Sequence, residues 1–261
     1  MEKNRLDVMM VERGIAGSRS LAQRLIMAGQ VRVNGQIAEK PSLKFDNTVK
    51  IVLETGPRYI SRGGEKLEAG LAAWNLLDLS GLVCVDVGAS TGGFTDCLLQ
   101  HKADRVYAVD VGYGVLHWKL RNDPRVVCME RTNARYIESF PENVNLVTVD
   151  ASFISLRVLL PVIHLWQSKD GLLIALIKPQ FEAGRKDAAK GAGVIRDPEV
   201  HRRVIEEVFY EAQKSGYGIK GLIRSPLLGP KGNTEFLTYL SWNESSLSHL
   251  DELINQVIGG Q

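Results

Sequence analysis

Four charged side chains border the most apolar runs of this sequence, at positions where a hydrophobic core does not require a charged residue. One precedes the first run, two close later runs and one begins the last; they are Lys66, Asp150, Lys178 and Glu235. If these runs are strands of one open α/β sheet, their ends form the edge at which such sheets bind ligands. Amines and carboxylates gathered there could orient a substrate and move a proton. Alternatively, each could be a solvated charge at the end of a strand.

Lys178 is the hardest of the four to explain as a solvated charge. It follows six consecutive apolar residues and precedes Pro179, which fixes the direction of the chain. We therefore expect the amine to be partly desolvated. Desolvation and a second ammonium nearby both favour the neutral form, and a neutral amine can act as a general base.

The segment VDVGASTGGFT at residues 85–95 is typical of a ligand-binding turn between a strand and a helix. Its small residues allow a tight turn and close approach of a ligand. Asp110, 22 residues after Gly88, could accept hydrogen bonds from ribose hydroxyls. The spacing GxxxGG differs from the GxGxxG of dinucleotide sites, and a carboxylate at Asp86 would repel phosphate. The turn therefore favours S-adenosylmethionine over NAD.

One further residue belongs to this predicted cofactor site. Asn133, in the segment RTNAR, lies between the strand-like runs at 105–112 and 144–150. It could face an adenine ring or be an ordinary turn residue. A glycine-rich turn without a ligand is the alternative for the whole segment, but Asp110 at the expected distance favours a nucleoside-containing ligand. The predicted cofactor contacts are Asp86, Gly88, Ser90, Gly92, Phe94, Asp110 and Asn133.

The elements that must position these residues follow from the hydrophobic pattern. A helical stretch over 64–76 precedes short β-branched runs that alternate with helical stretches; the clearest runs are 82–88, 105–112, 144–150 and 171–178. This alternation predicts a parallel sheet covered by helices on both faces. Two closing runs, 217–225 and 234–242, could form an antiparallel hairpin at the edge of the sheet.

The beginning of the chain has a different pattern. Two helical patterns, over 5–13 and 21–28, precede an alternating segment with Asn34-Gly35 at its centre, the strongest short hairpin signal. Two helices followed by a hairpin form a small α+β unit. Glu54–Pro57 is typical of a linker.

We accordingly predict two domains, residues 1–56 and 57–261, and they differ in charge. The first sixty residues contain ten Lys and Arg against six Asp and Glu, whereas the rest contains 22 against 24. A basic first quarter suggests contact with a polyanion, although a solvated basic surface is the alternative.

The composition excludes several classes of protein. With 44% hydrophobic and 24% charged residues among 261, the chain can form a sizeable core. Three widely spaced cysteines without a CxxC pair predict neither a disulfide framework nor a metal site. The N-terminus is too charged for a signal peptide, and the apolar runs are too short to span a bilayer. We expect a cytoplasmic protein without metal or membrane association.

Motifs along nearly the whole chain resemble those of one known family. Lys66, Asp150, Lys178 and Glu235 are similar to the Lys-Asp-Lys-Glu tetrad of FtsJ-like ribose 2′-O-methyltransferases. The N-terminal unit resembles the αL-type RNA-binding module of ribosomal small-subunit protein four. Together they resemble the TlyA (hemolysin A) family of ribosomal RNA cytidine-2′-O-methyltransferases. The motifs are LAQRLIMAGQVRVNG, SRGGEKL, DVGASTGGFTD, VDVGYG, TVDASFISL, LIKPQFE and GNTEFL.

The resemblance implies a fold, a cofactor and a substrate. The fold is a Rossmann-like class I methyltransferase domain, with a mostly parallel seven-stranded sheet and helices on both faces, plus a small α+β RNA-binding domain. The cofactor is S-adenosylmethionine. The partner is ribosomal RNA or a ribosomal subunit, and the target is a cytidine ribose in large-subunit RNA, in some members also in small-subunit RNA.

The resemblance also suggests roles for the site residues. As a hypothesis, Lys178 takes or stabilises the proton of the ribose hydroxyl, Asp150 holds Lys178, and the remaining two position the hydroxyl. Basic residues would contact RNA phosphates, and three of them, Arg5, Arg19 and Lys40, match basic positions of the family. The full predicted set is Arg5, Arg19, Arg24, Arg32, Lys40, Lys44 and Arg62.

Three other interpretations are weaker. A non-catalytic, ribosome-associated RNA-binding factor has no need to retain both lysines and both carboxylates. A hemolysin, which one family name suggests, would need a spanning segment or a strongly amphipathic basic helix, and the pattern shows neither. An NAD-dependent enzyme is disfavoured by the GxxxGG spacing.

Overall fold

The chain folds into two units, which are described separately. The computed structural model describes residues 3–54 and 56–259, and the chain divides into compact units of residues 1–58 and 59–261. Thr55, in the predicted linker, lies outside the described residues. The boundary between the units lies after Arg58 in the chain, whereas the sequence pattern placed it after Gly56.

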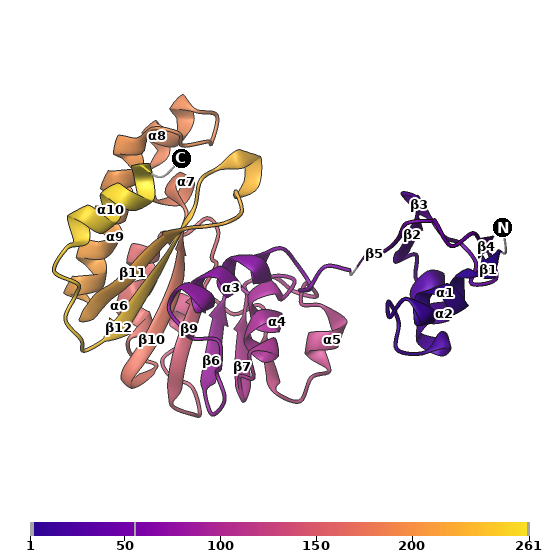
Figure 1. Cartoon of the computed structure of the whole chain (residues 1–261). Helices are drawn as coiled ribbons and strands as arrows, with labels where there is room; N and C mark the ends of the chain where they lie inside the picture. The colour runs from indigo at the N-terminus through magenta and orange to yellow at the C-terminus, as the bar shows by residue number, and fades with distance from the viewer. Residues whose placement is uncertain (1–2, 55, 260–261) are drawn as a thin grey trace. The chain divides into compact units, whose positions relative to one another are not determined.

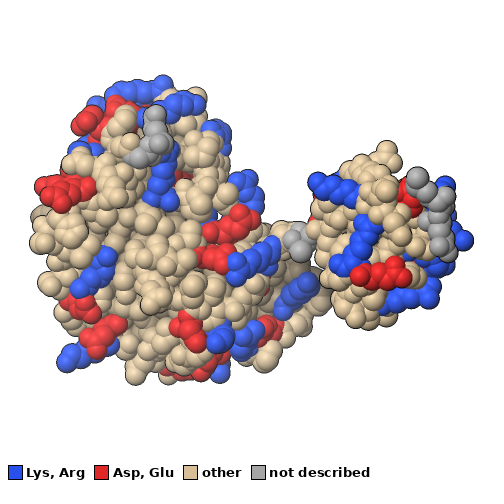
Figure 2. Space-filling model, viewed as in Figure 1, with Lys and Arg blue, Asp and Glu red and all other residues tan. Residues whose placement is uncertain are grey.

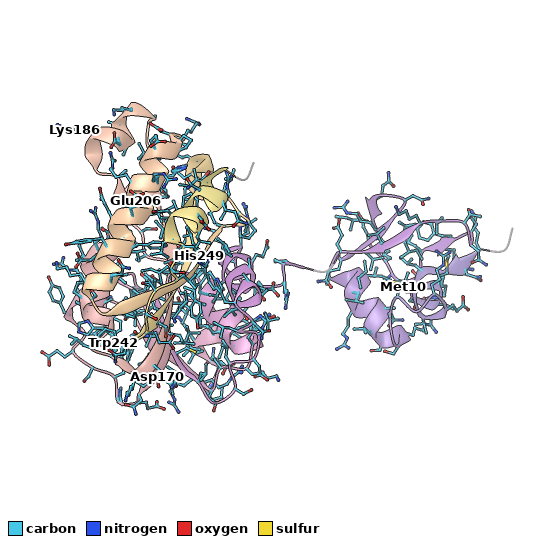
Figure 3. All side chains as sticks on the ribbon, turned by 60° about the vertical axis from the view of Figure 1, so that its left-hand side comes forward. Met10, Asp170, Lys186, Glu206, Trp242 and His249 are labelled. Atoms are coloured by element: carbon cyan, nitrogen blue, oxygen red, sulfur yellow. The ribbon has the colours of Figure 1, made fainter. Side chains whose placement is uncertain are left out.

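In the N-terminal unit two helices share a core with short strands (Figure 1). Asn34 and Gly35 have φ of 50° and 85°, which gives the predicted hairpin its left-handed turn. Ser18 caps the second helix by accepting a hydrogen bond from the Leu21 N–H. Met10 lies at the centre of the unit (Figure 3). The elements are β1 (Asn4–Arg5), α1 (Leu6–Glu12), α2 (Arg19–Met27), β2 (Val31–Val33), β3 (Gln36–Ile37), β4 (Lys44–Phe45) and β5 (Ile51–Leu53).

A seven-stranded sheet forms the centre of the C-terminal unit, in the order β11-β12-β10-β9-β6-β7-β8 (Figure 1). Neighbours from β10 to β8 pair in parallel, whereas β12 is antiparallel to both β10 and β11. The predicted mostly parallel sheet with a closing antiparallel hairpin is therefore confirmed. The strands are β6 (Val83–Val87), β7 (Arg105–Val109), β8 (Val126–Met129), β9 (Val144–Val149), β10 (Gln167–Ile177), β11 (Tyr217–Arg224) and β12 (Phe236–Trp242).

Helices cover both faces of this sheet, as the alternating pattern predicted. Because successive strand residues point to opposite faces, Cys84 joins the apolar cluster that contains Leu67 of α3 and Leu98 of α4. Val85 joins the cluster that contains Val208 of α9. The helices are α3 (Gly63–Ala73), α4 (Gly93–Gln100), α5 (Trp118–Arg121), α6 (Leu156–Ile163), α7 (Pro179–Glu182), α8 (Arg185–Lys190), α9 (Pro198–Lys214) and α10 (Leu250–Gly259), with 3₁₀ turns η1 (Ala134–Tyr136) and η2 (Pro230–Gly232).

The strand order reverses at β6, which lies between β7 and β9. After β6 the chain adds β7 and β8 on one side of it, and then crosses over to add β9 and β10 on the other. In open α/β sheets such a reversal opens a crevice outside the carboxyl ends of the strands. The turn after β6 and the residues that follow β9 and β10 therefore meet at one place.

Candidate active site

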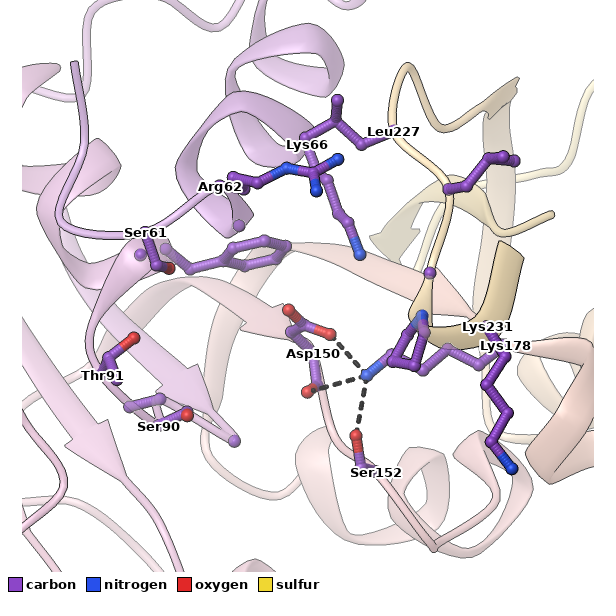
Figure 4. Close-up of a pocket in the computed structure, with 18 residues that line it drawn as sticks. Ser61, Arg62, Lys66, Ser90, Thr91, Asp150, Ser152, Lys178, Leu227 and Lys231 are labelled. Atoms are coloured by element: carbon purple, nitrogen blue, oxygen red, sulfur yellow. Dashed lines mark hydrogen bonds and ion pairs between the residues drawn. The ribbon is translucent and has the colours of Figure 1, made fainter. Parts of the chain in front are cut away.

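A cavity of about 550 Å³ opens at the carboxyl ends of β6, β9 and β10 (Figure 4). Its lining comes from three segments that are far apart in sequence, within 61–66, 88–94 and 227–231, together with residues that follow β9 and β10. Three of the four ionisable residues predicted from the sequence line it: Lys66, Asp150 and Lys178. The volume is within the range of small-molecule sites.

The ammonium of Lys178 contacts three oxygen atoms in this cavity (Figure 4). Its Nζ lies 2.6 Å from Asp150 Oδ1 and donates to the Asp150 carbonyl at 3.3 Å and to Ser152 Oγ at 3.0 Å. The residues meet because β9 and β10 are parallel neighbours, with Val149 opposite Ala175 near their carboxyl ends. The side chain of Lys178 is 8% exposed, so the predicted burial is found. The contacts with the Asp150 carbonyl and Ser152 are hydrogen bonds, and the contact with Asp150 Oδ1 is an ion pair.

Lys66 and Glu235 form a second ion pair. Lys66 Nζ lies 2.6 Å from Glu235 Oε2, and Gln180 Nε2 donates to Glu235 Oε1 at 3.1 Å. The Glu235 side chain is fully buried. It lies behind Gly229, where any Cβ would collide with Oε1. Glycine at this position thus lets the 227–231 loop cover the carboxylate while Lys66 reaches the cavity.

The amino end of α3 is fixed against the glycine turn, and this positions Lys66. The Ile60 N–H donates to Asp96 Oδ2 of α4 at 2.9 Å. A Cβ on Gly93 would collide with the Ser61 hydroxyl and lie 3.0 Å from the Gly64 nitrogen. The close approach of the two segments therefore requires glycine at 93.

A second cavity of about 510 Å³ runs from the glycine turn across the ends of β6 and β7. It shares Gly88, Ser90, Asp150 and Ser152 with the first cavity. Asp110 and Asn133 both line it, as the predicted cofactor contacts require. The Asp110 carboxylate accepts from the Ser90 N–H at 2.8 Å and the Gly112 N–H at 2.7 Å, so its orientation is fixed. Asn133 accepts from the Arg135 N–H at 3.1 Å.

Gly88 marks the point where the two cavities meet. Its φ is 82°, and a Cβ would lie 2.9 Å from the Asp150 carbonyl oxygen and 3.0 Å from Ala151. The turn can therefore pass close beside the end of β9 only without a side chain. The two carboxylates along the second cavity, Asp110 and Asp150, suit a ligand that contains hydroxyls or positive charge rather than phosphate.

Asp86 is placed differently from the other predicted cofactor contacts. Its carboxylate is fully buried, lines neither cavity, and accepts hydrogen bonds from Thr95 at 2.6 Å and Thr148 at 3.2 Å. Residues at even positions of β6 face α4, because side chains alternate along a strand. Burial raises the pKa of the Asp86 carboxyl to about 7. Asp86 thus supports the turn from below instead of facing the cavity.

Two other predicted contacts also lie off the second cavity. Gly92, with φ of 100°, is the N-cap residue of α4, and a Cβ there would collide with the side chains of Leu116 and Leu120. Phe94 lines the first cavity together with Arg62, one of the predicted RNA contacts. Both cavities are therefore built on the glycine turn, but from different residues of it.

Sequence reasoning missed several residues at this site. Ser152 accepts from Lys178. Phe153 is 90% exposed, has φ of 64° and lines the second cavity, and its ring centroid lies 5.0 Å from that of Phe181. An aromatic residue so exposed in the left-handed region is unusual and typical of functional sites. The available signal was its place directly after the strand that ends at Asp150.

The predicted RNA contacts of the N-terminal unit differ in their surroundings. Arg32 is partly buried and pairs with Glu54 at 2.5 Å. Arg5 and Arg19 both bind Asp7. The face of this unit seen in Figure 2 shows more basic than acidic surface. The members of the predicted set that are exposed in this unit are Arg19, Arg24, Lys40 and Lys44.

The sheet, the glycine turn and the two ion pairs define the FtsJ-like class of methyltransferase. The FtsJ-like methyltransferase family matches residues 59–242, and the S4 domain family matches residues 4–46. The chain belongs to the TlyA (hemolysin A) family, as its motifs predicted. Among the residues that the structure describes, every helix is too short or too polar to span a lipid bilayer.

Relatives match over most of their length. YqxC of Bacillus subtilis is 47% identical over 248 residues, which cover 92% of this chain and 86% of that protein. The 16S/23S rRNA (cytidine-2′-O)-methyltransferase TlyA of Mycobacterium tuberculosis is 44% identical over 240 residues, 90% of this chain and 89% of that one. A solved structure from Streptococcus thermophilus, of a protein named as a hemolysin, is 42% identical in sequence and has a TM-score of 0.75. The match covers 99% of this chain and 95% of that chain.

Proposed function

We propose that this protein methylates the ribose 2′-oxygen of a cytidine in ribosomal RNA, with S-adenosylmethionine as the methyl donor. The observation that carries the proposal is the arrangement of two ion pairs, Lys178 with Asp150 and Lys66 with Glu235, at a cavity that shares the glycine turn with a second one. The named activity of the Mycobacterium tuberculosis relative supports the choice of cytidine and ribosomal RNA.

The second cavity supplies the residues that would hold S-adenosylmethionine. The Asp110 carboxylate, fixed by two backbone N–H groups, can accept hydrogen bonds from ribose hydroxyls. Asn133 lies near η1, where an adenine ring would fit. Gly88 and Ser90 form the border with the first cavity. When bound, the cofactor supplies a methyl group activated by a sulfonium.

Lys178 and Asp150 are placed to act on the ribose hydroxyl. A hydroxyl oxygen that replaces Ser152 Oγ would accept a hydrogen bond from the ammonium. This contact stabilises the negative charge that develops on the oxygen as its proton passes to solvent water. The Asp150 carboxylate, 2.6 Å from Nζ, keeps the ammonium in position. Because a developing oxyanion gains more from a fixed cation than a neutral hydroxyl does, this contact favours the transition state.

Lys66 supplies a second positive charge at the first cavity, and Glu235 fixes it. The carboxylate is held from the other side by Gln180 at 3.1 Å. A buried carboxylate with two donors cannot move without losing both hydrogen bonds. Lys66 is therefore held at one place, where its remaining N–H groups can orient the target nucleotide.

Phe153 offers a surface for the target base. A ribose hydroxyl inside a duplex or a stacked loop is reached most easily when the nucleotide turns out of the stack. A base that has left its stack gains from an aromatic face, and Phe153 presents one beside Asp150 and Ser152. Phe181 packs against the ring at a centroid distance of 5.0 Å.

The test combines a map of 2′-O-methyl positions in ribosomal RNA with a variant of Lys178. Purified protein, ribosomal subunits and labelled S-adenosylmethionine should yield methylation at a cytidine ribose. Lys178→Ala should lower turnover by roughly 10²- to 10³-fold, the range for loss of one donor to a developing oxyanion. Cofactor affinity by calorimetry should be nearly unchanged, because the lysine lines only the first cavity.

Lys169→Ala is a matched control. Lys169 lies on β10, the strand that ends directly before Lys178, but near the opposite end of that strand. Its side chain is exposed. Its replacement should leave turnover unchanged. Methylation by Lys178→Ala at the wild-type rate would refute the role of the lysine. The absence of any 2′-O-methylcytidine dependent on this protein would refute the proposed reaction itself.

A further inference from the structure

A buried carboxylate in the N-terminal unit holds two arginines side by side. Asp7 is fully buried in the first turn of α1. Its Oδ1 accepts from Arg5 Nε at 3.0 Å, and its Oδ2 accepts from Arg5 Nη2 at 3.0 Å and Arg19 Nε at 2.9 Å. Gln23 Nε2 completes the set at 2.8 Å. We call these four residues the Asp7 cluster; it joins β1, α1 and α2.

The two arginines use only part of their hydrogen-bonding capacity on Asp7. The side chain of Arg5 is 37% exposed and that of Arg19 is 55% exposed. Arg19 binds Asp7 through Nε alone, and Arg5 leaves Nη1 unused; neither makes another hydrogen bond within the described residues. A guanidinium has five N–H donors. Several donors therefore remain available on the exposed side of each arginine.

A third cation lies next to this pair. β1 pairs with β4 in antiparallel register, with Arg5 opposite Lys44. Directly opposed residues of paired strands point to the same face of the sheet. Lys44 is exposed, so its charge adds to that of Arg5 on one face.

The charge of the Asp7 cluster is not balanced from within. Two guanidinium groups share a single carboxylate, so the cluster carries one net positive charge, and Lys44 adds a second. The hydrogen bond from Arg5, followed by those from Gln23 and Arg19, holds the pKa of Asp7 well below its usual range. The carboxylate is therefore ionised at every working pH, so both arginines have a charged partner throughout that range. Arg32, by contrast, is neutralised by Glu54 alone.

From this geometry we infer that Asp7 is a positioning residue, which holds Arg5 and Arg19 as a two-arginine clamp for RNA phosphate. The inference rests on the proposal that RNA is the substrate. A fixed pair of guanidinium forks can bind phosphate oxygens with little loss of side-chain freedom, and Arg suits phosphate better than Lys for this reason. The carboxylate lowers the net charge of this surface by one, but it orients both guanidinium groups.

This inference makes a prediction opposite to that of simple charge attraction. Asp7→Asn removes one negative charge beside the phosphate site, so attraction alone would tighten RNA binding. Loss of the clamp should instead weaken it, by roughly tenfold or more. Glu39→Gln is the matched control, because Glu39 is an exposed acid of the same unit. It changes the net charge equally and should leave affinity unchanged or slightly higher.

The assay is the binding of a large-subunit ribosomal RNA transcript to the full-length protein, measured by fluorescence anisotropy at several KCl concentrations. Circular dichroism checks that each variant is folded. Arg19→Lys gives a second test if Asp7→Asn unfolds the unit, because it keeps the charge and removes the fork. It should also weaken binding, by severalfold.

Each outcome is decisive. Tighter or equal binding by folded Asp7→Asn, or unchanged binding by Arg19→Lys, would overturn the clamp. Failure of the wild-type protein to bind the transcript would instead overturn the proposed RNA substrate, and methyl transfer is not needed for either readout.

Discussion

Replacement of Asp86 by Asn should change how the stability of the C-terminal unit depends on pH. The carboxylate is fully buried below the glycine turn, and burial raises its pKa to about 7 from an ordinary value of 3.8, against hydrogen bonds from Thr95 and Thr148 that lower it. The folded state therefore binds the proton more tightly than the unfolded chain does. Stability due to this group is greatest at low pH and is lost as pH rises from about 4 to about 7.

The magnitude follows from the shift. Each pKa unit corresponds to roughly 1.4 kcal/mol, so the ionised carboxylate costs the fold about 4 kcal/mol once pH exceeds 7. Asn cannot ionise, so Asp86→Asn should not lose this stability. The free energy of unfolding of the variant minus that of the wild type should therefore increase by roughly 2 to 3 kcal/mol from pH 5 to pH 8. A constant offset from altered hydrogen bonds does not affect this slope.

Urea unfolding followed by tryptophan fluorescence measures this unit alone, because all four tryptophans lie in it; they are Trp74, Trp118, Trp166 and Trp242. Asp251→Asn, at an exposed carboxylate of α10, is the control and should show no such slope. If the difference between Asp86→Asn and the wild type were the same at pH 5 and pH 8, the reasoning from burial would be refuted.

Two further predictions concern the cavities. Gly88→Ala should weaken binding of S-adenosylmethionine by roughly tenfold or more, because its Cβ would lie 2.9 Å from the Asp150 carbonyl oxygen in addition to the strain of a positive φ. Gly81→Ala has the same strain (φ of 80°) without any atom within 4 Å, and calorimetry should find its affinity unchanged; equal losses in both variants would contradict the steric argument. Phe153→Ala should raise the Kd for RNA by roughly 5- to 150-fold, the range for one lost base–aromatic stack, with unchanged affinity for S-adenosylmethionine. Tyr210→Ala removes another exposed aromatic residue, on α9, and an equal loss of RNA affinity there would show that Phe153 has no special role.

Much of the fold could be predicted from local pattern. The alternation of β-branched runs with helical stretches indicated the parallel sheet, and Asn34-Gly35 indicated the hairpin, because period and turn chemistry are properties of short segments. Residues 64–76 were predicted to be helical, and α3 spans Gly63–Ala73. Asp110 could be assigned to a ligand site because it directly follows β7, and the end of a strand fixes where the next side chain lies.

The partners of the ionisable residues could not be predicted in this way. Lys66 and Glu235 are 169 positions apart, and nothing in either segment indicates that they form a pair. Asp86 was expected to face the ligand, but the phase of β6 in the sheet turns it toward α4. Such facts depend on register and on which face of a strand a helix covers, and both are set by the packing of whole elements.

Local sequence patterns were enough to indicate which chemistry-bearing residues follow which strands, because propensity and periodicity act over a few residues. The folded structure was needed to show that Lys66 pairs with Glu235, that Gly229 must lack a side chain to cover Glu235, and that Arg5 and Arg19 share Asp7. These arrangements arise from contacts between distant segments, and burial in the folded chain gives them their energy.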